Sequence, residues 1–131
     1  MNQKFKILTA TLAIAFSIQA KASDPTVTKD IVIAVNEVFV PGGFDSRTEA
    51  YVVVSGLFPN GCYKWKGAIL KDQDAFTHDV TSVATVSQGM CIQVLVPFSK
   101  EVKLGHLSTG THLLHFLSND GTYMEKKLVV E

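Results

Sequence analysis

The chain has 131 residues, with 12 basic and 12 acidic side chains, four histidines and two cysteines. That length suits one domain with a core of its own. Cleavage of the signal peptide predicted below for residues 1–22 would leave nine basic residues against 12 acidic ones, a formal charge of −3. This balance gives no electrostatic reason to bind nucleic acid or an anionic membrane surface.

The first 22 residues have the three parts of a secretory signal peptide. Lys4 and Lys6 give a positive start, residues 7–18 form a short apolar run, and residues 20–22 are a small-x-small cleavage site. A membrane anchor is the alternative, but no stop-transfer flank follows the run. We therefore predict an exported protein, periplasmic or secreted, that has no stable membrane anchor after cleavage and begins at Ser23.

After a flexible leader at residues 23–28, residues 29–131 are expected to form one domain. Runs of β-branched and aromatic residues alternate with turn signals at intervals of about eight to fifteen residues. They predict strands at residues 29–40, 49–55, 62–70, 77–86, 91–96, 100–104, 111–118 and 122–130. No segment of the mature chain is convincingly helical. The predicted fold is therefore all-β: a two-sheet β-sandwich of about seven to eight antiparallel strands with one disulfide.

The strand at residues 62–70 alternates in character. Tyr63, Trp65 and Ile69 fall on one face, whereas two lysines fall on the other, so one face should be solvated. We expect Trp65 to be buried in the core beside the disulfide. The alternative is that Tyr63 and Trp65 form an exposed platform for a carbohydrate or another ligand.

The two cysteines, Cys62 and Cys91, are expected to form the disulfide because exported chains meet an oxidising compartment. If successive strands run alternately up and down, both cysteines open strands at the same end of the sandwich and can come within bridging distance. A bridge across 29 positions would constrain the unfolded chain by roughly 3–4 kcal/mol. It would also leave no thiol for catalysis or zinc binding.

The same alternation of strands places three loops at one end, at residues 57–61, 87–90 and 105–110. These loops carry Phe58, Met90 and His106. Aromatic and methionine side chains on loops are typical anchors of protein interfaces, so we predict that these three residues bind a partner. The alternative is that Phe58 and Met90 fold inward and cap the open end of the sandwich.

No catalytic motif is present: the chain lacks a Gly-x-Ser-x-Gly elbow, a phosphate-binding glycine loop and a His-Glu-x-x-His pair. We therefore predict no enzyme activity, no cofactor and no metal. His112 and His115, three apart on a strand, should point to opposite faces, and His78 is expected at the surface. His106 and Met90 are ligands that copper accepts, but two ligands do not make a site.

The segment at residues 72–77 begins like a calcium-binding loop. Phe76 and Thr77 stand at its fifth and sixth positions, where a ligand and a glycine are expected. A solvated turn is therefore the better interpretation.

The stretch from Val102 to Phe116 resembles the end of many immunoglobulin-like and fibronectin-III-like domains, in which a leucine and a glycine-threonine turn precede a strand that usually begins with tyrosine. Here His112 stands near that position, so a tyrosine corner is not implied. The Gly-x-x-Pro-x-x-Cys segment at residues 56–62, with its later cysteine and Pro97-Phe98, also resembles small exported bacterial proteins. The resemblance implies an immunoglobulin-like β-sandwich and an exported location, not an activity.

These observations favour a non-catalytic exported module that binds a protein partner or supports an envelope assembly. Two alternatives stay open. One is a periplasmic protein that handles copper or zinc, or a small enzyme, using the loop histidines. The other is a protease inhibitor that presents the loop Leu57–Gly61, because a disulfide beside a proline-containing loop would hold it rigid.

Overall fold

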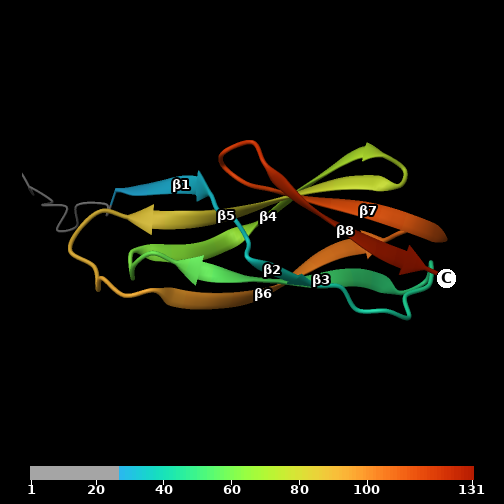
Figure 1. Cartoon of the computed structure of the whole chain (residues 1–131), viewed down its shortest axis with the longest axis horizontal. Coiled ribbons are helices and arrows are strands. Elements are labelled where there is room, and N and C mark those ends of the chain that lie inside the picture. Colours follow the sequence, from blue (N-terminus) through green and yellow to red (C-terminus); the bar gives the residue numbers. More distant parts are fainter. Residues whose placement is uncertain (1–26) are drawn as a thin grey trace, which may run out of the picture.

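A computed structural model describes residues 27–131, so the predicted signal peptide and residues 23–26 of the predicted leader lie outside the described residues. The described chain forms eight strands (Figure 1). They are β1 (Thr28–Val32), β2 (Glu37–Phe39), β3 (Glu49–Phe58), β4 (Tyr63–Asp74), β5 (Thr77–Ser87), β6 (Val96–His106), β7 (Gly110–Leu117) and β8 (Tyr123–Val130).

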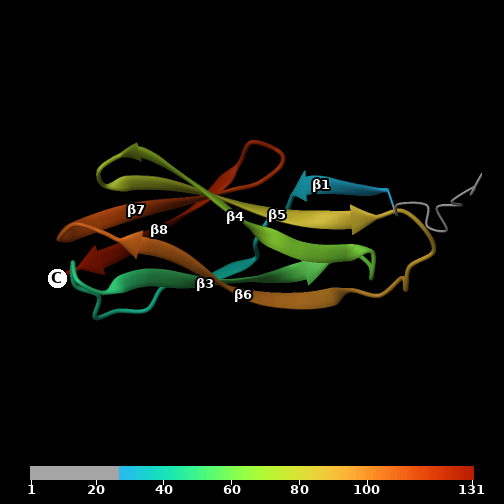
Figure 2. The same ribbon diagram turned by 180° about the vertical axis from the view of Figure 1, so that it is seen from behind.

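The strands form two sheets that face each other, as Figures 1 and 2 show from opposite sides. The five-stranded sheet is built around β5. β4 pairs with β5 along one side, whereas β1 and β7 share the other side, and β8 pairs with β7. The three-stranded sheet has the order β2-β3-β6. The predicted all-β, two-sheet sandwich with one disulfide is therefore confirmed.

One pair, β5 with β7, is parallel, contrary to the antiparallel arrangement that we predicted. The reason lies in the connection between them. β6 belongs to the other sheet, so the chain leaves β5, returns along β6 in the opposite direction, and crosses back into β7. Two reversals restore the direction of β5. Immunoglobulin-like sandwiches are built from antiparallel sheets, so the strand pairing departs from that part of the prediction.

Several strand boundaries also differ from the prediction, and β3 and β4 run to Phe58 and Asp74 instead of ending at residues 55 and 70. The predicted strand at residues 29–40 is two strands, β1 and β2, which lie in different sheets, and Thr28 of the predicted leader begins β1. The predicted strands at 91–96 and 100–104 are one strand, β6, and residues 91–95 lie outside any strand. Pro97 does not end a strand but lies near the start of β6, which tolerates it because β6 is an edge strand with only β3 as its partner.

A β-bulge in β4 changes which side chains face the core. The register with β5 shifts between Trp65 and Gly67, so the positions after the bulge exchange faces. Trp65 and Ala68 pack against the core, whereas Ile69, which was expected to share a face with Trp65, is 60% exposed. Trp65 itself is half-buried rather than buried, and its ring lies 5.8 Å from that of Phe98.

The core consists of two clusters. The larger one joins both sheets through β3, β5, β6, β7 and β8, and its largest fully buried apolar side chain is Phe116. The smaller one lies toward the disulfide and contains Ile33, Phe58, Ala84 and Phe98. Within residues 27–131 there is no helix of a length and apolarity that could cross a membrane.

Candidate functional site

The disulfide links Cys62, directly before β4, to Cys91 in the connection between β5 and β6, with 5.4 Å between the Cα atoms. This confirms the predicted bridge. Two backbone hydrogen bonds fix the same region: the Gly61 N–H donates to the Ile92 carbonyl at 2.9 Å, and the Ser87 N–H donates to the Cys62 carbonyl at 3.0 Å. We call this end of the sandwich the disulfide end.

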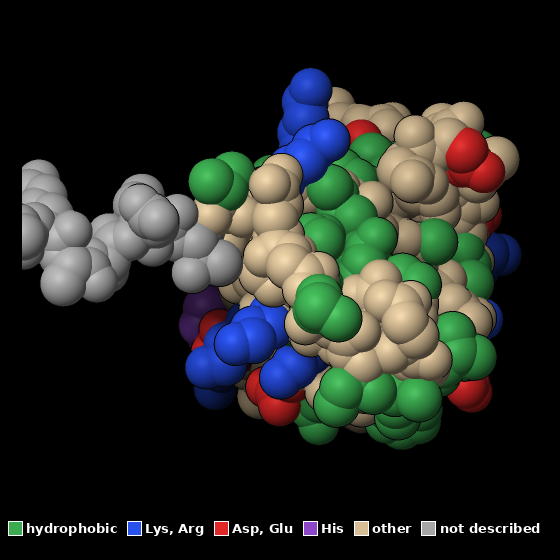
Figure 3. Space-filling view, turned by 90° about the vertical axis from the view of Figure 1, so that its left-hand side faces the viewer, with side chains coloured by type: hydrophobic (Ala, Val, Ile, Leu, Met, Phe, Trp, Pro, Cys, Tyr) green, Lys and Arg blue, Asp and Glu red, His purple; other side chains and the backbone are tan. Residues whose placement is uncertain are grey.

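The connection between β5 and β6, residues 88–95, carries four apolar side chains that are each more than half exposed. They are Met90, Ile92, Val94 and Leu95, with exposed fractions between 54% and 104%. Figure 3 shows this end of the molecule, where hydrophobic side chains gather at the surface. We call residues 88–95 the apolar loop. None of these four side chains belongs to the smaller core cluster, in which Phe58 stacks on Phe98 with 4.4 Å between ring centroids.

The three residues predicted to bind a partner do not come together. Phe58 is only 4% exposed and caps the core, as the alternative prediction had it, whereas Met90 is fully exposed on the apolar loop. His106 lies at the opposite end of the sandwich, because β3 and β6 pair Phe58 with Val96 and Glu49 with His106. The prediction that the loop at 105–110 shares the disulfide end is therefore wrong. The prediction assumed two short strands where β6 is a single long one, and this extra reversal of the chain placed the loop at the wrong end.

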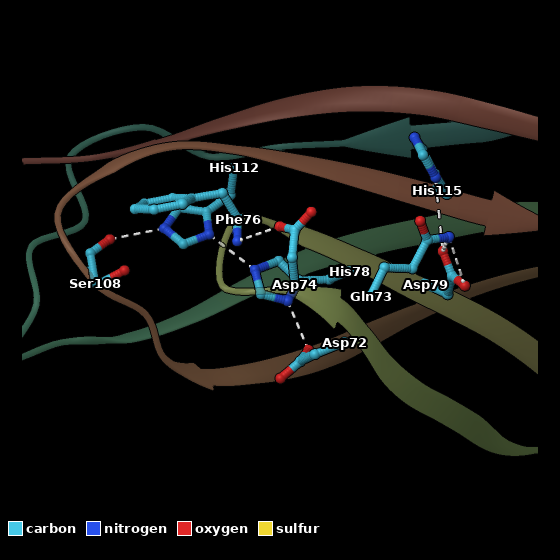
Figure 4. A network of polar contacts seen from close by, with 9 residues as sticks. All are labelled: Asp72, Gln73, Asp74, Phe76, His78, Asp79, Ser108, His112 and His115. Atoms are coloured by element: carbon cyan, nitrogen blue, oxygen red, sulfur yellow. Dashed lines mark hydrogen bonds and ion pairs between the residues drawn. The ribbon is translucent and has the colours of Figure 1, made fainter.

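At the opposite end, which we call the histidine end, a chain of hydrogen bonds runs through the interior (Figure 4). His78 on β5 and His112 on β7 contact each other through Nε2 and Nδ1, which are 2.8 Å apart. The other nitrogen of His78, Nδ1, lies 2.6 Å from an Asp72 carboxylate oxygen. The other nitrogen of His112, Nε2, lies 2.7 Å from the Ser108 carbonyl oxygen. His78 and His112 are 5% and 0% exposed, and we call them the histidine pair.

Burial of His78 contradicts the prediction that it lies at the surface. Along β5 the buried residues alternate, and His78 shares the inward face with Val80, Ser82 and Ala84. The sequence does indicate this inward face, because small and apolar residues occupy every second position after His78. The outward positions carry threonines and a valine, which are also strand formers, and this obscured the alternation between the two faces. His112 and His115 do point to opposite faces, as predicted. His115 lies outward, 3.1 Å from a Glu125 carboxylate oxygen and 3.6 Å from one of Asp79.

The segment after β4 is a tight turn. The Phe76 N–H donates to the Asp74 carboxylate at 2.8 Å. This bond, with a smaller contribution from the charge of His78, holds the pKa of Asp74 below its usual value. Asp72 is exposed, but the turn that we predicted for residues 72–77 covers only residues 75 and 76, because Asp72 belongs to β4 and Thr77 begins β5. Residues 27–131 contain no group of three or more histidine, cysteine or acidic side chains placed to hold a metal ion.

A second apolar surface lies on the outer face of β1, β5 and β4. It is a shallow hollow of about 440 Å³ over Val32, Gly67, Ile69 and Val83, and it opens where the bulge at Gly67 leaves no side chain. Lys66 pairs with Asp30 at its edge and holds the pKa of Asp30 below its usual value. The hollow lies on a regular sheet face, whereas the apolar loop projects from the fold.

A family model of the ORF11 beta-sandwich domain matches residues 52–130, which is more than half of the chain. The chain therefore belongs to the ORF11 beta-sandwich domain family. The match runs from within β3 to within β8 and so includes both cysteines, the apolar loop and the histidine pair. No curated protein and no solved structure matches the chain.

Proposed function

We propose that this domain is an exported, non-catalytic β-sandwich module that binds a protein partner through the apolar loop, as part of an envelope assembly. The observation that supports it is the exposure of Met90, Ile92, Val94 and Leu95 on one short connection. A contiguous apolar surface of this kind is typical of interaction sites, since single exposed apolar residues are common but clusters are not.

The disulfide supports a role in binding because it limits the freedom of the loop. Cys91 lies within the loop and is bonded to Cys62, and Ile92 is held by the backbone bond from Gly61. A loop that is already ordered loses little conformational entropy on binding, so more of its contact energy becomes affinity. A disulfide also fits the oxidising compartment that the predicted signal peptide would lead to.

A protein partner is favoured over a lipid surface by charge. The formal charge of −3 for residues 23–131 would not attract the chain to an anionic bilayer. A pocket or groove in another protein, lined by apolar side chains, has no such requirement.

The other functions considered for this chain have less support. The segment Leu57–Gly61 is not a free loop, since Leu57 and Phe58 belong to β3 and Phe58 is buried, which leaves little for a protease inhibitor to present. The copper pair of His106 and Met90 is separated by the length of the sandwich. The two-sheet architecture supports a relationship to immunoglobulin-like domains, whereas the parallel pair β5–β7 does not support one.

Photo-crosslinking in the producing cells tests the proposal. A photoreactive amino acid at Ile92 should give a discrete crosslinked protein band. The same substitution at Ile69 should not, although Ile69 is similarly exposed (60% against 72%) and borders the hollow on the sheet face. Equal crosslinking at both positions, or none at Ile92, would contradict the proposal. Flotation of the purified protein with anionic lipid vesicles would instead indicate a lipid partner.

A further inference from the structure

The histidine pair joins four separate parts of the chain. Asp72 comes from the end of β4, His78 from β5, His112 from β7, and Ser108 from the connection between β6 and β7. The two rings are nearly parallel, at 21°, with centroids 5.0 Å apart, and the Phe76 ring lies 5.0 Å from that of His112. Figure 4 shows the two histidine rings between Ser108 and Asp72.

The hydrogen-bond partners decide where the protons are. A backbone carbonyl only accepts, so Nε2 of His112 must carry the proton that it donates to Ser108. In a neutral His112, Nδ1 then accepts, and Nε2 of His78 must be the donor. Nδ1 of His78 faces the carboxylate of Asp72, whose side chain is 71% exposed. Because a carboxylate also only accepts, all three contacts are hydrogen bonds at the same time only if His78 carries protons on both nitrogens.

We propose that His78 and His112 together hold one proton, and that this shared proton makes the histidine end a pH-sensitive clamp between β4, β5, β7 and the 107–109 connection. This inference is independent of the proposed function, because it concerns the other end of the molecule. With one proton on the pair, all three hydrogen bonds are satisfied. With none, either the contact between the rings or the contact with Asp72 lacks a hydrogen. With two, both rings are cations and two N–H groups face each other.

The surroundings favour the singly charged pair. The carboxylates that face it both come from the end of β4: Asp72 in direct contact, and Asp74, whose pKa the charge of His78 helps to lower. On β7 and β8, the inward neighbours of His112 are the apolar Leu114 and Leu128. Within residues 27–131, the buried polar residues are His78, Ser82 and His112, so β3 and β6 bring no buried charge to the pair. His115 with Asp79 and Glu125 faces outward.

Proton counting gives the sign of the pH dependence. In the unfolded chain, two free histidines bind two protons well below about pH 6.5 and none well above it. If the folded pair binds one, the unfolded state holds an extra proton on the acid side, and stability rises with pH there. On the alkaline side the folded state holds the extra proton, and stability falls. The contribution of the pair should therefore peak near pH 6.5, with each limb approaching a tenfold change in the unfolding constant per pH unit, about 1.4 kcal/mol.

Nitrogen NMR of the unmodified protein tests the proton assignment directly. Long-range correlations from the ring carbon-bound protons to both ring nitrogens distinguish protonated from bare nitrogen. Near pH 6.5 we expect two protonated nitrogens on His78, and a protonated Nε2 with a bare Nδ1 on His112. His106, which is exposed, serves as the reference. Two rings that titrate together as His106 does, or a neutral His78 at that pH, would overturn the proposal.

A surface variant gives an independent test that does not disturb the core. Asp72→Asn removes the counter-charge of the shared proton, so its loss of stability should be largest at or below about pH 6.5 and should shrink toward pH 8, where the native pair also loses its proton. Glu101→Gln removes another exposed carboxylate, which is not one of those that face the pair, and should give a pH-independent difference over that range. If the loss of stability were the same in both variants and did not change with pH, the proposal would be overturned.

Discussion

The two ends of the sandwich depart from the usual distribution of side chains in opposite ways. At the disulfide end, apolar residues such as Met90 and Ile92 remain outside the fold. At the histidine end, the ionisable His78 and His112 lie inside it. Both departures are informative, because exposed apolar clusters are typical of interaction sites and buried polar groups need hydrogen-bond partners. The histidines have their hydrogen-bond partners within the chain, whereas the partner that we propose for the apolar loop is another protein.

Different interactions also hold the two ends of the sandwich together. Stacked aromatic rings and a covalent bond close the disulfide end. A row of hydrogen bonds closes the histidine end, and within residues 27–131 every buried side-chain nitrogen and oxygen has a hydrogen-bond partner. The first kind of closure is insensitive to pH, whereas the second depends on a proton. Four changes, from the largest expected effect to the smallest, would sharpen or break this comparison.

Phe58→Ala should have the largest effect on stability. The ring is buried, stacks on Phe98 and lies 5.8 Å from the ring of Tyr63, so its removal leaves a cavity in the smaller core cluster. We expect the free energy of unfolding to fall by about 3–5 kcal/mol, as measured by chemical denaturation. Crosslinking from position 92 should persist under conditions in which the variant is folded. A variant of normal stability that has lost its partner would mean that Phe58 is an anchor rather than a cap.

Replacement of both Cys62 and Cys91 by serine should cost about 2–4 kcal/mol, because it frees the unfolded chain. The same variant should lose crosslinking from Ile92, since the loop would no longer be held in place. In the native protein, thiol titration under denaturing, non-reducing conditions should find no free thiol. Two free thiols in the native protein would break the comparison, since the disulfide end would then have no covalent closure.

Gly110→Ala tests how tightly the histidine end is packed. Gly110 has φ +137°, and a Cβ there would lie 2.9 Å from the Phe76 ring, which covers His112. We expect a loss of about 1–3 kcal/mol from the backbone strain, with the contact adding to it. Gly121→Ala is the matched control, since Gly121 also has a positive φ, +85°, but no atom lies within 4 Å of its added Cβ. An equal loss in both variants, by thermal or chemical unfolding, would show that Phe76 moves aside without cost.

Met90→Ala should have the smallest effect on stability, within about 0.5 kcal/mol, because the side chain is fully exposed. Its effect on partner binding should be larger than its effect on stability, in contrast to Phe58→Ala. The two variants should therefore separate the inside of the disulfide end from its outer surface. Destabilisation by a kilocalorie or more would show that Met90 is part of the core and would remove it from the proposed interface.

Much of the local structure follows from local chemistry, and here the sequence was a good guide. The tight turn at residues 119–121 depends on backbone preferences, and Gly121 adopts the positive φ that such a turn requires. The alternation along residues 111–118 depends only on the geometry of a strand, so the opposite faces of His112 and His115 were predictable. The disulfide was predictable from the presence of two cysteines in a chain with a predicted signal peptide.

What the sequence could not determine were the features that depend on which strands become neighbours. Nothing local to β5 and β7 shows that they pair in parallel, since their direction follows from the passage of the chain through β6 in the other sheet. The histidine pair exists because of that pairing, which brings two residues 34 positions apart to within a hydrogen bond. The apolar loop looked like a strand because a run of Ile, Val and Leu has the same composition whether it pairs or not. In the structure Phe58 and Phe98 belong to the smaller core cluster and the loop residues do not, and only the tertiary structure decides which apolar residues form a core.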